Sequence, residues 1–259
     1  MFGWWRLRAE LARWRRAGRR PVLWWRDDDA RTVTPQLRRL LVHATRADVP
    51  LCLAVIPKDL DQALCEVVAP YPRIAILQHG FAHLNAAGSP PAEFSPADEP
   101  AVVAGRLAEG WARLEGFRRR LPVYVPPWNT LTPNVVTALA KSGHRAVSAW
   151  GEMSRPARVD AHLDLMRWRG APRFAGRERV LGRLTGLLAW RRRLGLWPEP
   201  IGLLTHHLAH DEEAWRFLEE LLLFAPLQAG VDWPEAPALF GVPVRVAEPT
   251  PVSRKGQSS

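Results

Sequence analysis

Short apolar runs alternate with helical patterns along most of the chain, and this alternation limits the folds that are available. The clearest runs contain four to six consecutive apolar residues and end at proline or polar residues. A strand that is apolar throughout is buried on both faces, which is typical of a parallel sheet covered by helices. We predict strands at 22–25, 51–56, 73–77, 123–125, 145–150, 163–168 and 201–205.

Helix signals fall between these strands. Thr34 and Thr132 each stand before a proline, which places an N-cap residue ahead of the first helical position. Leu37, Leu40 and Leu41 then follow at the spacing of one helical face. Strands and helices in alternation predict right-handed crossovers, and therefore a parallel sheet or barrel. Predicted helices cover 34–44, 59–68, 100–120, 132–143, 177–194 and the segment after Asp211.

No linker or change in composition divides the 259 residues, so we expect one α/β domain. Its predicted range is 20–244. Residues 1–19 are predicted to form a basic amphipathic helix before it. Residues 245–259 are polar and are predicted to be a disordered tail.

The charge balance suggests an anionic partner. Lys and Arg number 36 against 26 Asp and Glu, which gives a net charge of +10. The basic residues are spread out, with local density mainly in the first twenty residues and at 191–193, and no nucleic-acid motif surrounds them. We therefore expect no nucleic-acid partner.

The N-terminal helix has two interpretations. Trp4, Leu7, Leu11 and Trp14 share one face, opposite many arginines. Such a helix packs on its own domain or lies on an anionic membrane. No run in the chain is long enough to cross a bilayer, and the two cysteines give no sign of an oxidising compartment. We expect a cytoplasmic protein, with peripheral contact at the inner membrane as the second option.

Three predicted strands end in groups of polar residues. Three aspartates, residues 27–29, follow the first strand; His79 and His83 follow the third; His206 and His207 follow the last. In folds of alternating strands and helices, the carboxyl ends of the strands form the site. Two histidines and one carboxylate suit zinc or another divalent transition metal with open positions for water. Such a metal activates water, which favours hydrolysis of an amide or ester.

These residues resemble the motifs of a known family. Asp27-Asp-Asp-Ala30, His79-Gly-Phe-Ala-His83, Val125-Pro-Pro-Trp128 and Leu204-Thr-His-His207 are similar, in order and spacing, to those of the polysaccharide deacetylases (NodB homology, carbohydrate esterase family 4). The resemblance spans about residues 20–225. It implies a distorted (β/α) barrel, here with about seven parallel strands, and a bacterial hydrolase of carbohydrate metabolism that removes acetyl groups from N- or O-acetylated sugars.

The resemblance also implies residue roles. Asp28 would be the catalytic base and Asp29 a metal ligand, although a shift by one would select Asp27 and Asp28 instead. His206 would be the catalytic acid. The other implied metal ligands are His79 and His83, with zinc as the expected ion. The implied substrate-binding residues are Pro127, Trp128, Asn129 and His207.

Two positions depart from the family pattern. Val125 stands where an arginine usually orients the catalytic aspartate, and Arg26 or Arg167 could supply that charge from elsewhere. Ala30 replaces a glycine, so the backbone there must accept a Cβ atom. The missing arginine motivates one alternative, a glycan-binding protein that has the fold but little turnover. A second alternative, a binder of nucleic acid or another anionic surface, rests only on the net charge.

Overall fold

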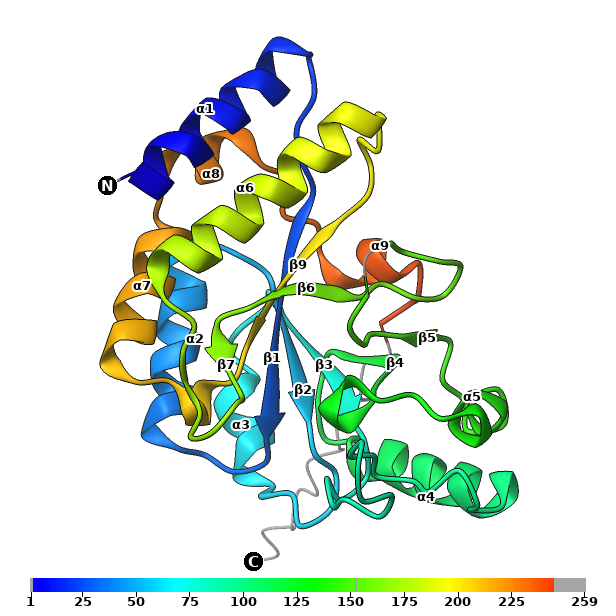
Figure 1. Cartoon of the computed structure of the whole chain (residues 1–259). Helices are drawn as coiled ribbons and strands as arrows, with labels where there is room; N and C mark the ends of the chain where they lie inside the picture. Colours follow the sequence, from blue (N-terminus) through cyan, green and yellow to red (C-terminus); the bar gives the residue numbers. More distant parts are fainter. Residues whose placement is uncertain (1, 152, 245–259) are drawn as a thin grey trace, which may run out of the picture.

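The computed structural model describes residues 2–151 and 153–244. Its main sheet has seven parallel strands in the order β5-β4-β3-β2-β1-β9-β6. The strands fan out and curl into a half-barrel (Figure 1), which confirms the predicted distorted (β/α) barrel. The strands are β1 Leu23–Ala30, β2 Leu51–Val55, β3 Ile74–His79, β4 Arg120–Val125, β5 Ala146–Val147, β6 Ala161–Asp164 and β9 Ile201–Thr205.

Helices lie on both sides of the sheet (Figure 1). A short antiparallel hairpin, β7 Met166–Arg167 and β8 Arg173–Phe174, joins the edge strand β6 to a long helix. On one side lie α1 Phe2–Arg16, α2 Pro35–Ala47, α3 Ala63–Val68, α6 Arg177–Leu194, α7 Glu212–Leu222 and α8 Ala225–Gly230. Helices α4 Pro100–Arg113 and α5 Pro133–Leu139 pack on the same outer face, against Gln78 and Tyr124, whereas α9 Ala236–Phe240 packs in the inner core with Trp24.

Alternate residues of each strand enter two different cores. Leu23 and Trp25 of β1 pack in the core shared with the outer helices. Trp24 points to the inner core, where its ring meets Phe240 edge-on at 5.6 Å. The two-residue period of a strand produces this division. It explains why the apolar runs are continuous, since both faces of the sheet are buried.

Several predicted boundaries differ from the structure. Strand β1 continues through the three aspartates, because Asp27 pairs with Thr205 of β9 and Ala30 pairs with Val55 of β2. Helix α4 ends at Arg113 rather than near 120, because Arg120 already opens β4. The predicted strand 163–168 is divided into β6 and β7, since the chain turns after Asp164 to form the hairpin.

The N-terminal helix α1 packs on its own domain. Leu7, Leu11 and Trp14 are buried, and α1 lies along α6. Trp14 Nε1 donates to the Leu188 carbonyl at 3.1 Å. The apolar face of α1 is thus used within the protein, one of the two alternatives that its pattern allows. Residues 245–259, where the tail was predicted, lie outside the described residues.

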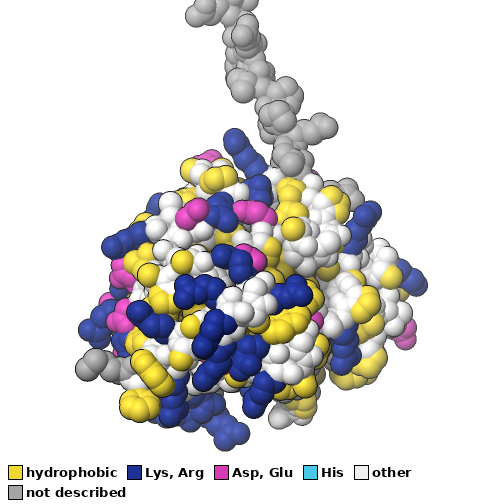
Figure 2. Space-filling model, turned by 90° about the horizontal axis from the view of Figure 1, so that it is seen from above, with side chains coloured by type: hydrophobic (Ala, Val, Ile, Leu, Met, Phe, Trp, Pro, Cys, Tyr) yellow, Lys and Arg dark blue, Asp and Glu magenta, His cyan; other side chains and the backbone are white. Residues whose placement is uncertain are grey.

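The surface near α1 and α6 is strongly basic. Figure 2 views the molecule from this side, and Lys and Arg side chains cover much of the face while acidic ones are sparse. Throughout the described part of the chain, no helix is both long enough and apolar enough to span a bilayer. The Lys and Arg side chains seen in Figure 2 are thus spread over a broad face rather than confined to one short segment.

Candidate active site

The predicted site residues meet at one edge of the sheet. Strands β1, β3, β4 and β9 run parallel, so their carboxyl ends lie at the same edge (Figure 1). The aspartates come from β1, one histidine pair from the end of β3 and the other from the end of β9. Residues 50 to 180 positions apart in the sequence are thus brought into contact.

Asp29, His79 and His83 form a compact cluster. One ligand atom from each lies within 4.8 Å of the other two. Asp29 Oδ1 lies 3.2 Å from His79 Nε2 and 3.3 Å from His83 Nε2. His79 Nδ1 is 3.1 Å from the Val125 carbonyl, which accepts its proton and leaves Nε2 available as a ligand. Two imidazoles and a carboxylate converging in this way fit a divalent transition metal.

The pKa shifts of Asp29 and His83 favour the protonation states of metal ligands, whereas the shift of His79 opposes them. Burial raises the pKa of Asp29, but the hydrogen bond and charge of His79 outweigh it, and the pKa lies well below its usual range. Burial lowers the pKa of His79, but the charges of Asp28 and Asp29 outweigh it and raise the pKa. Burial, followed by the charge of His79, lowers the pKa of His83. Asp29 is therefore ionised and His83 neutral near pH 7, as ligation requires.

Unusual backbone conformations gather at the site. Asp29, His83, Trp128 and Asn129 have φ angles of 72°, 57°, 53° and 56°, in the left-handed region that side chains seldom adopt. Strain of this kind persists where the surrounding structure fixes the residue, often at functional sites. Ala30, which replaces the motif glycine, is part of the extended strand β1, so its Cβ atom adds no strain.

Asp28 forms a buried ion pair with Arg26. Arg26 Nε lies 2.9 Å from Asp28 Oδ1, and Nη2 donates to Oδ2 at 3.0 Å. The side chains are 0% and 2% exposed, so water does not screen the pair. Arg26 and Arg167 were the two candidates to replace the motif arginine that is absent at Val125. Arg26 is the one that pairs with Asp28. The arginine therefore comes from β1 itself, two residues before the aspartate.

Further hydrogen bonds fix Arg26 in place. Its Nη1 donates to the Ser148 carbonyl at 2.9 Å and to Ser148 Oγ at 2.7 Å. Its Nη2 also donates to Asn129 Oδ1 at 2.7 Å. Nothing in the sequence pattern identified Ser148, because it follows a two-residue strand that carries no motif. These contacts hold the guanidinium group rigidly against Asp28.

Asp27 faces away from this pair, on the other side of β1. Thr205 Oγ1 donates to its Oδ2 at 2.6 Å, and the His207 backbone N–H donates to the same oxygen at 3.1 Å. His207 Nδ1 lies 2.5 Å from Asp27 Oδ1. Asp27 and His207 are both fully buried. The geometry therefore favours the register with Asp28 and Asp29 at the site, and His207 supports the strand rather than facing open space.

His206 lies at the same edge, between two carboxylates. Its Nε2 is 4.0 Å from Asp28 Oδ2, and its Nδ1 is 3.8 Å from Asp164 Oδ1. The Trp168 ring meets the imidazole edge-on at 4.5 Å. Burial raises the pKa of Asp164, although the charge of His206 opposes the rise. In the sequence, this segment suggested a role only for Arg167; the signal for Asp164 was its position at the end of a strand.

The segment after β4 forms a wall of the site. Pro127 is buried, whereas Trp128 is 37% exposed. The Trp128 ring lies against His83, with ring centroids 4.4 Å apart. Asn129 turns inward to Arg26. Of the three predicted substrate-binding residues here, only Trp128 therefore presents a large exposed surface.

Glu93 holds the histidine loop in shape, and no sequence motif indicated it. Its carboxylate accepts hydrogen bonds from the backbone N–H groups of Phe81, Ala82 and His83, at 2.8 Å for Phe81 and His83. Gly80 makes room for this contact, because a Cβ atom there would lie 2.1 Å from Glu93 Oε2. Successive N–H groups aimed at one carboxylate form a nest, which fixes the backbone that presents His83.

Comparison with known proteins gives structural matches. No protein-family model and no curated protein matches the chain. A protein from Mycobacterium smegmatis assigned as a polysaccharide deacetylase matches with a TM-score of 0.61 and 15% identity, over 90% of this chain and 96% of that one. The chitin deacetylase of the fungus Colletotrichum lindemuthianum matches with 0.53 and 14%, over 86% and 88%.

A pseudoenzyme is also represented among the neighbours. A mutant of a family 4 carbohydrate esterase pseudoenzyme matches with a TM-score of 0.53 and 12% identity, over 82% of this chain and 64% of that one. At these identities the likeness concerns the fold, while the activity has to be argued from the site. The chain therefore has the fold of these polysaccharide deacetylase (NodB homology) structures.

Proposed function

We propose that this protein is a metal-dependent hydrolase that removes acetyl groups, through amide or ester hydrolysis, from an acetylated sugar or glycan. The observation that carries the proposal is that the Asp29, His79 and His83 cluster lies next to a second carboxylate, Asp28. Solved structures with this fold include a chitin deacetylase. A binding module alone would have little need for this set of buried ionisable groups.

Asp29, His79 and His83 are the residues that would hold the metal. Zinc is our preferred ion, because two imidazoles and one carboxylate are a common ligand set in catalytic zinc sites. A divalent ion held there would lower the pKa of a water molecule and polarise the acetyl carbonyl. The orientation of His79 by the Val125 carbonyl and of His83 by Glu93 would limit the rearrangement that binding requires.

In this proposal Asp28 is the general base. It accepts a proton from the attacking water, which then adds to the acetyl carbon. Arg26 keeps the carboxylate in one orientation through two contacts. In the family motif, an arginine at the position of Val125 orients the catalytic aspartate. We assign that function here to Arg26 on β1. The pairing of Arg26 with Asp28 supports a hydrolase over the glycan-binding alternative.

His206 is the proposed general acid. It donates a proton to the nitrogen or oxygen of the sugar as the bond to the acetyl group breaks, so the products are acetate and an amine or alcohol. Asp164 lies 3.8 Å from the opposite ring nitrogen and keeps the imidazole oriented. Trp128, exposed beside His83, is the proposed platform for the sugar ring. His207 has a structural role in this scheme.

The proposal is tested by metal content and acetate release on the same samples. Wild type is compared with His79→Ala, Asp29→Ala and Asp28→Asn, using acetylated chitin and xylan oligomers. We expect about one zinc per chain in wild type and in Asp28→Asn, and little in the two ligand variants. Acetate release should be lost in all three variants, on the order of 10³-fold or more for the ligand variants.

Different outcomes would separate the alternatives. Wild type that binds no metal in excess zinc would refute the hydrolase proposal. Metal binding and glycan binding without any acetate release would favour the glycan-binding alternative. Asp28→Asn with wild-type activity would refute the assignment of Asp28 as the base while leaving the metal site intact.

A further inference from the structure

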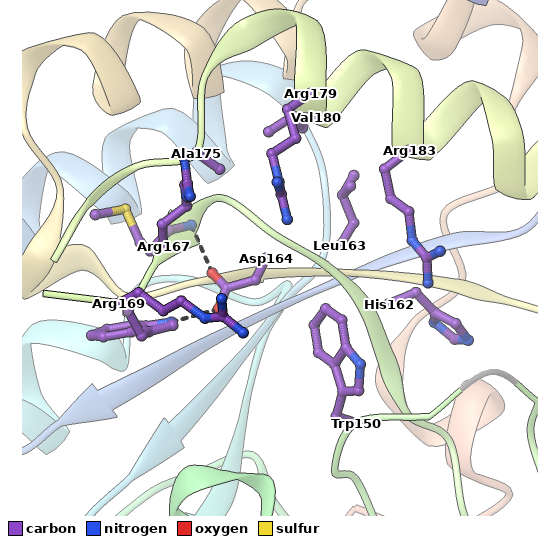
Figure 3. A pocket seen from close by; sticks show the side chains of 12 residues that line it. Trp150, His162, Leu163, Asp164, Arg167, Arg169, Ala175, Arg179, Val180 and Arg183 are labelled. Atoms are coloured by element: carbon purple, nitrogen blue, oxygen red, sulfur yellow. Dashed lines mark hydrogen bonds between the residues drawn. The ribbon is translucent and has the colours of Figure 1, made fainter.

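A basic cavity adjoins the proposed active site. It has a volume of about 640 Å³ and lies between α6 and the β7–β8 hairpin. We call it the arginine pocket, because Arg167, Arg169, Arg179 and Arg183 line it. Figure 3 shows Arg179 and Arg183 reaching from α6 towards the space that Arg167 and Arg169 approach from the hairpin side. Four positive charges thus surround one hollow.

The charges of the pocket are not neutralised by described neighbours. None of its four guanidinium groups forms an ion pair or hydrogen bond with another residue in 2–151 or 153–244. On the same helix, Arg177 pairs with Glu220 and Arg192 pairs with Glu10. The helix therefore uses acidic partners on either side of the pocket but not at it. Clustered, unpaired arginines repel one another, and an anion would relieve that repulsion.

The one carboxylate in the described wall is already engaged. Asp164 Oδ1 accepts from the Met166 backbone N–H at 2.8 Å, and Oδ2 accepts from Trp168 Nε1 at 2.7 Å. Dashed lines in Figure 3 mark both contacts. The carboxylate is thus held in place by its own segment of chain. Asp164 forms no ion pair with the four arginines that line the arginine pocket.

The pocket adjoins the proposed active site through two of its lining residues. Asp164 and Trp168 line it, and both contact His206, the proposed proton donor. A molecule that fills the pocket would therefore lie beside the group that protonates the leaving atom. Trp150 and Trp168, which are 42% and 48% exposed, add aromatic surface of the kind that packs against sugar rings.

We propose that the arginine pocket binds an anionic, phosphate-type group carried by the acetylated sugar, so that the substrate is a charged rather than a neutral glycan. This inference rests on the proposed function. Arginine forks bind tetrahedral oxyanions through paired hydrogen bonds. A pocket of this size holds a phosphate together with an adjoining sugar ring. Part of the net charge of +10 would thus serve to bind the substrate.

The test compares charged and neutral sugars on the full-length protein. Binding of N-acetylglucosamine, its 1-phosphate, its 6-phosphate and N-acetylmuramic acid is measured by calorimetry at two salt concentrations. Acetate release is measured on the same compounds. The variants are Arg179→Gln with Arg183→Gln, and Arg167→Gln with Arg169→Gln. The matched control is Arg193→Gln with Arg216→Gln, two exposed helical arginines outside the pocket.

We expect wild type to bind a sugar phosphate about tenfold or more tightly than the neutral sugar, with affinity that falls as salt rises. Each pocket pair should lose most of this preference, and the control pair should retain it. An equal gain with N-acetylmuramic acid would identify the bound group as any anion, whereas a gain with the phosphates alone would identify phosphate. Only the second result supports the proposal, and the first would overturn the assignment of a phosphate-type group.

Other results would overturn it. The proposed anion-binding role of the arginine pocket would be refuted if wild type bound neutral and charged sugars with equal affinity. It would also be refuted if both pocket pairs kept the preference for charged sugars. Loss of binding to anionic lipid vesicles in the pocket pairs, without any sugar preference, would assign the arginines to a membrane surface instead. Acetate release that is equally fast from neutral and charged sugars, in wild type and in both pocket pairs, would refute this inference and retain the deacetylase. A phosphate preference without acetate release from any sugar would refute the deacetylase and retain the pocket.

Discussion

Arg26 and Asp28 lie two positions apart on β1 and form a two-point ion pair that is fully buried, with contacts of 2.9 and 3.0 Å. In a strand, residues i and i+2 point to the same face. The alternation of one strand therefore brings the two side chains together, and Ser148 and Asn129 then hold the guanidinium group in place. Asp28, the proposed base, and the arginine that orients it belong to one short segment.

Replacing Arg26 with Gln should strongly impair both folding stability and catalysis. The change leaves Asp28 buried without its partner, which costs about 3–5 kcal/mol of unfolding free energy. Acetate release should fall on the order of 100-fold. Urea unfolding and the kcat for an acetylated oligomer measure the two effects.

The double variant Arg26→Gln with Asp28→Asn provides the matched control. It removes both charges, so most of the lost stability should return, while activity should stay low because no base is present. Stability that remains as low as in the single variant would contradict a simple ion pair. Activity of Arg26→Gln equal to wild type would show that Arg26 does not support the base.

Glu93→Gln should weaken metal binding. The substitution retains the shape of the side chain but removes the charge that holds the N–H groups of Phe81, Ala82 and His83. Substitutions of groups that orient metal ligands typically cost 10–100-fold in metal affinity. Zinc affinity is measured by competition with a chromogenic chelator.

Glu109→Gln is the control for Glu93→Gln. Glu109 forms an exposed ion pair with Arg113 on α4, away from the described cluster. Its replacement should leave zinc affinity unchanged, because exposed pairs contribute little. If both variants bind zinc as wild type does, the role of Glu93 in positioning the histidine loop is refuted.

Asp164→Asn should lower kcat with little change in KM for a neutral substrate. Asp164 acts through His206, whose Nδ1 lies 3.8 Å away, rather than on the sugar. A loss of about 10–100-fold is expected if the imidazole loses its orientation. An unchanged kcat would remove Asp164 from the mechanism.

The stability of the protein should decrease as the pH falls from about 6.5 to about 4. Burial lowers the pKa of His144 to about 4, and its ring nitrogens face Ser142 and Gln78. In this range the unfolded chain binds a proton that the folded chain does not, so unfolding becomes more favourable as pH falls. His210, whose pKa burial also lowers to about 4, acts in the same direction. The loss from His144 is at most about 3 kcal/mol.

Guanidinium unfolding at pH 4.5 and pH 7 measures this dependence. His144→Gln should flatten the curve while lowering stability at pH 7, because Gln can replace only part of the hydrogen bonding. Lys141→Gln, at an exposed position just after α5, is the control and should leave the pH dependence unchanged. A His144→Gln variant with the wild-type slope would show that other groups cause it.

Local sequence predicted the metal cluster but left the register of the aspartates open. Three consecutive acids have no internal feature that tells which one faces the site. The structure separates them by the alternation of β1: Asp28 shares the inner face with Arg26, and Asp27 faces His207 on the other side. Asp29 leaves this alternation through its φ of 72° and meets the histidines. A backbone angle of this kind cannot be read from residue type.

The parallel α/β architecture and the group of acids and histidines at the strand ends can be predicted from residue order. Buried strands and helix caps are local patterns, so they can be recognised without a structure. Which of these groups are in contact depends on the folded chain. Glu93 with the histidine loop, Asp164 with His206 and the four arginines of the pocket are contacts between distant segments. Such contacts depend on how the strands pair and how the helices pack. The residue pattern alone does not give the distance between two segments that are far apart in the sequence.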